Sequence, residues 1–209
     1  MKHILTITGA SGSGKDTIVD CLLCLNHNEP ENISPLATEF CDQWCSYVSF
    51  RELISHTTRM PREGEKEGID YHFIDFDTFE KIEKVEETEY AGNYYCLAAS
   101  ELENIEDNGW GVVIVDQHGR DCIETFVNHH QDEYSLTSVF LVITPEMSEI
   151  RMNYRGDSST AIARRLEQQE QRNEYRPADE SKYQFILSSI DDQSLYYNVM
   201  KIQDFLTHN

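Results

Sequence analysis

The sequence predicts an α/β protein built on a doubly wound parallel sheet. Three short apolar runs, at residues 3–8, 111–116 and 138–144, are rich in β-branched residues and have the length of strands that are buried on both faces. Helix-patterned segments alternate with such runs, and parallel strands need crossover connections of that kind. The 209 residues fit one domain, or one domain with an inserted lobe.

The N-terminal elements follow from composition and turn signals. The run at 3–8 leads into a Gly/Ser-rich turn, after which the apolar spacing predicts a helix over 16–25. Residues 26–50 contain Pro and polar residues with weak periodicity, which predicts a long connection with one short helix near 38–45.

The C-terminal half begins with the strand at 111–116, which ends in the carboxylate of Asp116. Further on, Pro145 suits the first turn of a helix that follows the strand at 138–144. The remaining pattern predicts a helix from the capping residues Ser158 and Ser159 to about residue 175, a short strand at 184–187 and a terminal helix over 191–206.

The charge balance excludes several classes of partner. Lys and Arg total 17 against 38 Asp and Glu, which gives a formal charge of −21 and would repel a phosphate backbone. The longest apolar runs are far too short to cross a membrane, and the first residues lead directly into a strand. We therefore expect a cytoplasmic protein with neither nucleic acid nor a membrane as a partner. A monomer and a homodimer both remain open.

Four of the six cysteines loosely resemble a zinc-site spacing. Cys21 and Cys24 are followed by Cys41 and Cys45, and four thiolates in paired short spacings can close a tetrahedron around zinc. The favoured interpretation is simpler: Cys21 and Cys24 fall in the predicted helix, where cysteine packs as a small hydrophobe.

A glycine-rich loop between the first strand and helix is the strongest functional signal. The stretch has the G-x4-G-K spacing of a P-loop, whose backbone N–H groups and helix N-terminus surround phosphate oxygens while its lysine approaches the β and γ phosphates. We therefore predict an ATP site made of Gly9, Ala10, Ser11, Gly12, Ser13, Gly14, Lys15, Asp16 and Thr17. A P-loop usually has Ser or Thr after the lysine to hold Mg²⁺; here Asp16 occupies that position and Thr17 follows, and either oxygen can meet the metal.

Arginines gather in one C-terminal segment of an otherwise acidic chain. Such a concentration suits a polyanionic ligand, because the guanidinium group matches phosphate geometry bidentately. For Arg172 and Arg176 the favoured alternative is pairing with glutamates along a helix. The six are Arg151, Arg155, Arg164, Arg165, Arg172 and Arg176.

A second constellation lies at residues 55–74. Arg59 and Arg62 flank a proline-stiffened turn, with Ser55 before them and Tyr71 after them. Two guanidinium groups with neighbouring hydroxyls can hold one phosphate monoester from several sides.

Together with the P-loop, this stretch closely resembles guanylate kinases, which transfer a phosphoryl group from ATP to GMP. The likeness continues through Glu86, residues 92–95, 113–119, 151–156 and 162–166. It covers nearly the whole chain except residues 26–50.

The resemblance implies a P-loop kinase fold of three parts and a role for each matching residue. The core would comprise 1–54, 98–150 and 166–209, with an inserted monophosphate-binding lobe at 55–97 and an arginine-bearing lid at 151–165. Lys15, Arg151, Arg155 and Arg165 would act on the transferred group, and Asp16, Thr17 and Asp116 near Mg²⁺. The acceptor phosphate would contact Ser55, Arg59, Arg62, Tyr71 and Tyr95, and Glu86 would accept from guanine N1–H and N2–H₂.

Leu97 departs from that pattern in a way that affects the base. The family has a Ser or Thr there whose hydroxyl contacts guanine O6. One alternative is therefore a kinase that acts on a broader set of deoxynucleoside monophosphates. The Gly14-Lys15-Asp16 of the P-loop also resembles that of kinases acting on ribose 1,5-bisphosphate, and a non-catalytic binding module of the same fold is a third alternative.

Overall fold

The structure is a computed structural model that describes residues 1–24, 49–62, 64–90 and 92–208. The helix expected near 38–45 lies outside these residues. None of the helices in the described ranges is long and apolar enough to span a bilayer.

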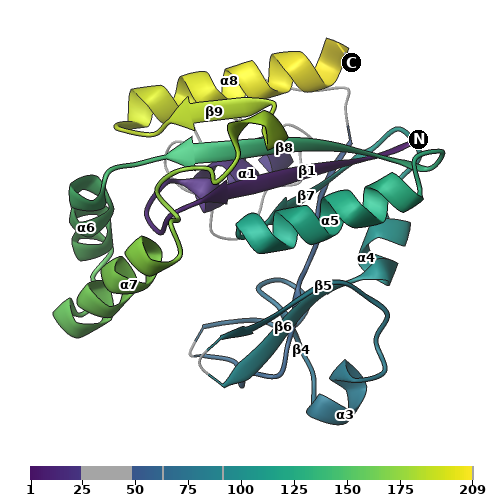
Figure 1. Ribbon diagram of the computed structural model, residues 1–209, viewed down its shortest axis with the longest axis horizontal. Coiled ribbons are helices and arrows are strands. Elements are labelled where there is room, and N and C mark those ends of the chain that lie inside the picture. The colour runs from purple at the N-terminus through teal and green to yellow at the C-terminus, as the bar shows by residue number, and fades with distance from the viewer. Residues whose placement is uncertain (25–48, 63, 91, 209) are drawn as a thin grey trace.

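A five-stranded parallel sheet forms the core, in the order β2-β7-β1-β8-β9. Its strands are β1 (Lys2–Gly9), β2 (Phe50–Glu52), β7 (Trp110–Ile114), β8 (Tyr134–Val142) and β9 (Phe185–Ser188). Because all five run in one direction, their carboxyl ends meet at one edge, where an open α/β sheet binds its ligands. The loops after β1 and β7 both open at that edge (Figure 1).

Helices cover both faces of this sheet, which confirms the doubly wound fold. One core contains Leu5 and Ile7 of β1 with the buried faces of α1 (Lys15–Cys24) and α8 (Asp192–His208). The other contains Ile4 of β1 with α5 (Gln117–His129). The alternation along β1 sends neighbouring side chains to opposite faces.

The cysteines of α1 belong to the first of these cores. Cys21 and Cys24 are 0% and 2% exposed and pack among aliphatic side chains. Cys21 is a free thiol, which agrees with the packing interpretation. Cys24 is disulfide-bonded, so that interpretation is wrong for Cys24. Cys41 and Cys45 lie outside the described residues.

A smaller sheet follows β2 in the chain, in the order β4-β3-β6-β5, and lies below the main sheet in Figure 1. Its neighbours pair antiparallel except β3 and β4, which are parallel. The elements are β3 (His56–Thr57), β4 (His72–Phe73), α3 (Phe76–Phe79), β5 (Lys84–Tyr90), β6 (Asn93–Ala98) and α4 (Ala99–Glu103).

Two helices extend beside the carboxyl edge of the main sheet, at the left of Figure 1: α6 (Pro145–Tyr154) and α7 (Ser159–Gln171). Pro145 occupies the first turn of α6, and Ser158 Oγ accepts from Ala161 N at the start of α7, as predicted. A 3₁₀ turn, η1 (Glu180–Lys182), follows them.

Two predicted boundaries are wrong for local reasons. The helix expected to reach residue 175 ends at Gln171, because Asn173 adopts a left-handed φ of 52°. The strand expected to include Asp116 ends at Ile114, because the Asp116 carboxylate caps α5 by accepting from Gly119 N.

Candidate active site

Three glycines shape the loop between β1 and α1. Gly9, Gly12 and Gly14 have φ values of 149°, 77° and 86°. A Cβ on Gly14 would lie 2.6 Å from Leu195 Cδ2, and one on Gly9 would lie 2.5 Å from the Leu141 carbonyl oxygen. The path of the loop therefore depends on glycine at these positions.

Lys15 folds back over this loop. Its Nζ donates to the carbonyl oxygens of Gly9 at 2.7 Å and Ala10 at 2.9 Å. Burial lowers the pKa of Lys15, and nearby Asp16 and Glu174 oppose that shift. Lys15 and Glu174 line a cavity of about 210 Å³ beside the loop. A partly desolvated ammonium group favours an anion in that cavity.

Side chains from later elements hold the rest of the loop. Each donates to one loop carbonyl: Ser148 Oγ to Ser11 (2.7 Å), Arg151 Nη1 to Gly12 (2.8 Å) and Ser189 Oγ to Ser13 (2.6 Å). These three contacts fix the carbonyls of the loop, and binding of phosphate by the loop's N–H groups stays a prediction from the sequence motif.

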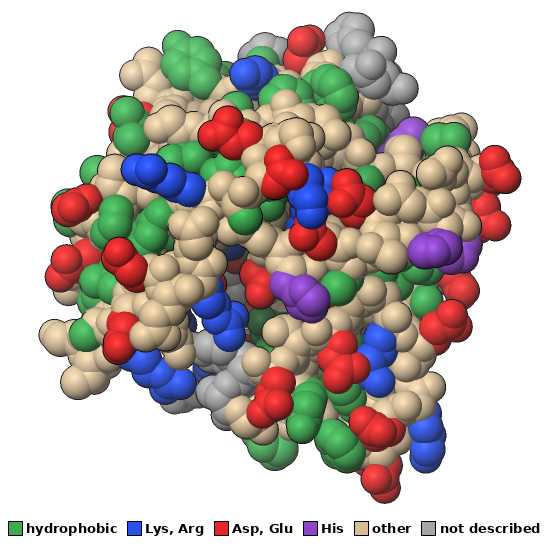
Figure 2. Space-filling model, viewed as in Figure 1, with side chains coloured by type: hydrophobic (Ala, Val, Ile, Leu, Met, Phe, Trp, Pro, Cys, Tyr) green, Lys and Arg blue, Asp and Glu red, His purple; other side chains and the backbone are tan. Residues whose placement is uncertain are grey.

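All six residues expected to bind the acceptor line one cavity of about 330 Å³: Ser55, Arg59, Arg62, Tyr71, Glu86 and Tyr95. Arg165 and Asp116 line it as well. Ile114, Val115 and Asp116 also line the cavity beside the P-loop, so the two cavities share a wall at the end of β7. Figure 2 shows Lys and Arg side chains bordering a hollow between α7 and the small sheet.

One end of this cavity is preformed and cationic. Arg59 donates to both carboxylate oxygens of Glu65 at 2.8 and 2.9 Å, and Arg62 N donates to Glu65 at 2.6 Å. The guanidinium of Arg59 also lies 5.4 Å from the centre of the Tyr71 ring, which makes an edge contact with Tyr95 at 5.9 Å. These contacts orient the groups that the sequence assigns to the acceptor phosphate.

The other end carries the carboxylate of Glu86, on β5. Glu86 is only 8% exposed, and a Cβ on Gly119 would lie 3.4 Å from its Oε2, which places the carboxylate against the first turn of α5. Desolvation, together with the charges of Asp116 and Glu87, raises the pKa of Glu86 to about 7. Donors that approach this carboxylate would therefore compensate a substantial burial cost.

Two of the arginines in the segment predicted to form a lid have an acidic partner. Arg155 donates to Asp157 at 2.6 and 3.1 Å, and Arg165 Nη1 lies 3.8 Å from the same carboxylate. Arg172 Nη1 lies 3.8 Å from Asp116 Oδ2 and lines the acceptor cavity. Arg172 therefore does not follow the favoured interpretation as a helical ion pair, since α7 ends one residue before it.

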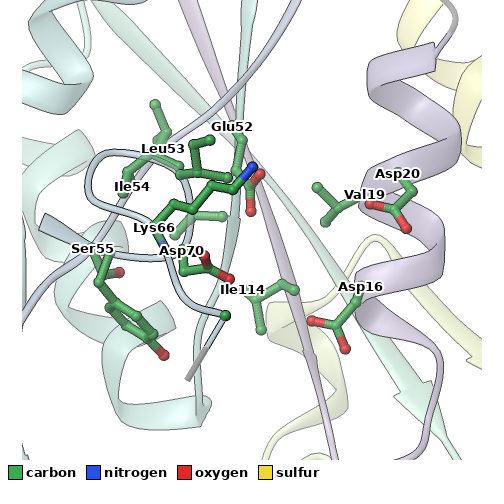
Figure 3. Close-up of a pocket in the computed structure, with 14 residues that line it drawn as sticks. Asp16, Val19, Asp20, Glu52, Leu53, Ile54, Ser55, Lys66, Asp70 and Ile114 are labelled. Atoms are coloured by element: carbon green, nitrogen blue, oxygen red, sulfur yellow. Dashed lines mark hydrogen bonds between the residues drawn. The ribbon is translucent and has the colours of Figure 1, made fainter. Parts of the chain in front are cut away.

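The predicted metal ligands occupy different surroundings. Asp16 lines a neighbouring cavity of about 410 Å³ with Glu52 and Asp70, and its carboxylate points from α1 toward that space (Figure 3). Asp116 Oδ1 accepts from Gly119 N at 2.8 Å. Among the described residues no three His, Cys, Asp or Glu side chains are grouped to hold a metal. This donor set suits a Mg²⁺ ion that keeps waters and is bound mainly through substrate phosphates, with Asp16 or Thr17 supplying a protein oxygen.

A glycine-rich loop between a parallel strand and a helix, at the carboxyl edge of a doubly wound sheet and beside an arginine-lined cavity, defines a P-loop kinase. The guanylate kinase family model matches residues 46–209. A guanylate kinase of Prochlorococcus marinus is 31% identical over 208 residues and 97% of each chain, and one of Neisseria meningitidis serogroup A is 34% identical over 78% of this chain and 70% of its own. The solved guanylate kinase of Anaplasma phagocytophilum shares the fold, with a TM-score of 0.61, 19% identity and coverage of 100% of this chain and 87% of its own. This chain belongs to the guanylate kinase family and is a nucleoside monophosphate kinase.

Proposed function

We propose that this chain transfers the γ-phosphoryl group of ATP to GMP or dGMP, giving ADP and the nucleoside diphosphate. The observation that carries the proposal is the wall shared by the P-loop cavity and the acceptor cavity, formed by Ile114, Val115 and Asp116. Two cavities in contact allow the donor and acceptor phosphates to meet, which is the main requirement of phosphoryl transfer.

Each part of the site has a proposed task. Lys15 and the loop N–H groups would hold the ATP phosphates, while Arg59, Arg62, Ser55, Tyr71 and Tyr95 would hold the acceptor phosphate. Arg151, Arg155 and Arg165 would act in the lid at 151–165, with 55–97 as the acceptor lobe and the rest as the core. Mg²⁺, bound with ATP, would neutralise phosphate charge.

Two contacts indicate what closing the lid requires. Arg155 donates twice to Asp157, so its guanidinium must leave that carboxylate to contact a phosphoryl group, whereas Arg165, 3.8 Å from the same carboxylate, already lines the acceptor cavity. Arg151 already contacts the loop through Gly12, so its proposed contribution is to hold the loop while the ATP phosphates bind. We further propose that the protein works in the cytoplasm as a monomer or homodimer.

A coupled assay of ADP formation tests the proposal. Wild-type protein with ATP and Mg²⁺ should form ADP rapidly with GMP and dGMP, and only slowly without an acceptor. Ribose 1,5-bisphosphate as the better acceptor, or ADP formation that no acceptor stimulates, would contradict it.

A further inference from the structure

A hydroxyl group that the family resemblance does not point to lies on the wall of the acceptor cavity. Thr88 follows Glu86 by two residues on β5, so the two side chains share one face of the small sheet, and both line the cavity. Within the described part of the chain, the Thr88 side chain has no hydrogen-bond partner. Its hydroxyl is therefore available to a ligand.

Glu86 has different neighbours on its two sides. On one side, Gly119 and Asp116 mark the first turn of α5, and the charge of Asp116 contributes to the raised pKa of Glu86. Along β5, the next residue on the same face is Thr88. The cavity wall therefore presents a hydroxyl and a carboxylate from one face of β5, and Asp116 lines the same cavity.

A hydroxyl beside a carboxylate complements one edge of guanine. The base presents the acceptor O6, the donor N1–H and the donor N2–H₂ in sequence, so a carboxylate opposite N1 leaves O6 on one side and the amino group on the other. Leu97, which pairs with Glu86 across the sheet, is fully buried among aliphatic side chains and offers no donor.

We propose that the Thr88 hydroxyl donates a hydrogen bond to O6 of the acceptor base and is a specificity-determining residue for 6-oxopurine monophosphates. This inference rests on the proposed function, since it concerns the base of the same acceptor. It assigns to β5 a contact that a hydroxyl at position 97 of β6 would otherwise make.

The test compares wild type with Thr88→Val, which removes the hydroxyl at nearly constant shape, and with Thr88→Ser, which keeps it. Affinities for GMP and for 6-thio-GMP, in which a weak sulfur acceptor replaces O6, are measured by calorimetry. Wild type and Thr88→Ser should bind GMP several-fold more tightly than 6-thio-GMP. Thr88→Val should lower the affinity for GMP by about five- to tenfold, which is the contribution expected of one neutral hydrogen bond, and should bind the two nucleotides with equal affinity.

Thr88→Val with unchanged GMP affinity would overturn the inference, as would an equal loss for GMP and 6-thio-GMP. The KM for ATP serves as a control and should not change. Wild type that binds GMP without forming ADP would contradict the proposed function alone, and the calorimetric comparison would still decide the role of Thr88.

Discussion

Arg172 Nη1 lies 3.8 Å from Asp116 Oδ2, across the wall that joins the two cavities. Asp116 caps α5 at the end of β7, whereas Arg172 follows directly after α7. The contact therefore links the arginine-bearing helix to the strand end where the donor and acceptor phosphates are proposed to meet. Any movement of α7 toward the sheet would therefore change the contact between Arg172 and Asp116.

Lys15→Ala should lower kcat by about 10²–10³, because it removes the cation that the P-loop places beside the transferred charge. GMP affinity should remain within about twofold, since Lys15 lines the P-loop cavity and not the acceptor cavity. Steady-state kinetics and GMP calorimetry check both expectations. Near-normal kcat in the variant would show that the loop is not the ATP site.

Arg59→Ala should raise the KM for GMP far more than the KM for ATP, because it deletes a charge-assisted contact to one substrate only. Lys81→Ala is a matched control, since Lys81 is an exposed cation of the same lobe that does not line the cavity. Equal losses for the two substrates would indicate misfolding or another binding lobe. A similar effect of Lys81→Ala would mean that overall charge, and not this site, attracts the acceptor.

The affinity for GMP should depend on pH through Glu86. Its pKa of about 7 in the free protein is raised by desolvation first, and the base donors prefer the ionised carboxylate. Full affinity is therefore expected above pH 7, with a loss of up to about tenfold per pH unit below it. Glu86→Gln should bind GMP more weakly and lose this component, keeping only the titration of the GMP phosphate. Identical pH profiles for the two proteins would remove Glu86 from the base site.

Glu86→Gln should also stabilise the ligand-free protein at alkaline pH. A carboxyl group whose pKa is raised on folding destabilises the folded state as pH rises from its unfolded value of 4.5 to about 7, and the penalty persists above that. The expected gain in the free energy of unfolding is at most about 3 kcal/mol at pH 8, with little change at pH 4. Denaturant titrations at the two pH values measure it. Equal stability at pH 8 would mean that Glu86 is not desolvated.

Ser189→Ala should lower the stability of the protein and its affinity for ATP, although Ser189 lies outside the P-loop sequence. The Ser189 hydroxyl donates to the Ser13 carbonyl and accepts from Arg151, and its loss leaves a buried carbonyl unpaired. The cost in stability should be about 1–3 kcal/mol, and the KM for ATP should rise while the KM for GMP stays constant. Thermal unfolding and kinetics check it, with Ser181→Ala on exposed η1 as the control. Wild-type values for both quantities would show that the loop does not need this contact.

Sequence alone located the P-loop because its glycines, lysine and flanking elements are contiguous. The hydrogen bonds that hold this loop were not predictable in the same way. Their donors, Ser148 and Ser189, lie 137 and 176 residues along the chain from the loop carbonyls that accept from them. Arg172 was misjudged because the helix pattern continued past Gln171, whereas the left-handed Asn173 ends it. Thr88 carried no motif signal, and its place on the wall of the acceptor cavity became visible only in the folded structure.

We propose that the cavity around Glu86 selects a guanine monophosphate. Adenine offers no donor at N1, so AMP would leave the buried carboxylate unpaired. The most direct test is the kcat/KM of the wild-type protein for GMP and dGMP against AMP, CMP and TMP at saturating ATP and Mg²⁺. We expect kcat/KM for the two guanine nucleotides to be higher by orders of magnitude. Values for AMP, CMP or TMP equal to or above those for GMP would contradict selection of guanine by Glu86.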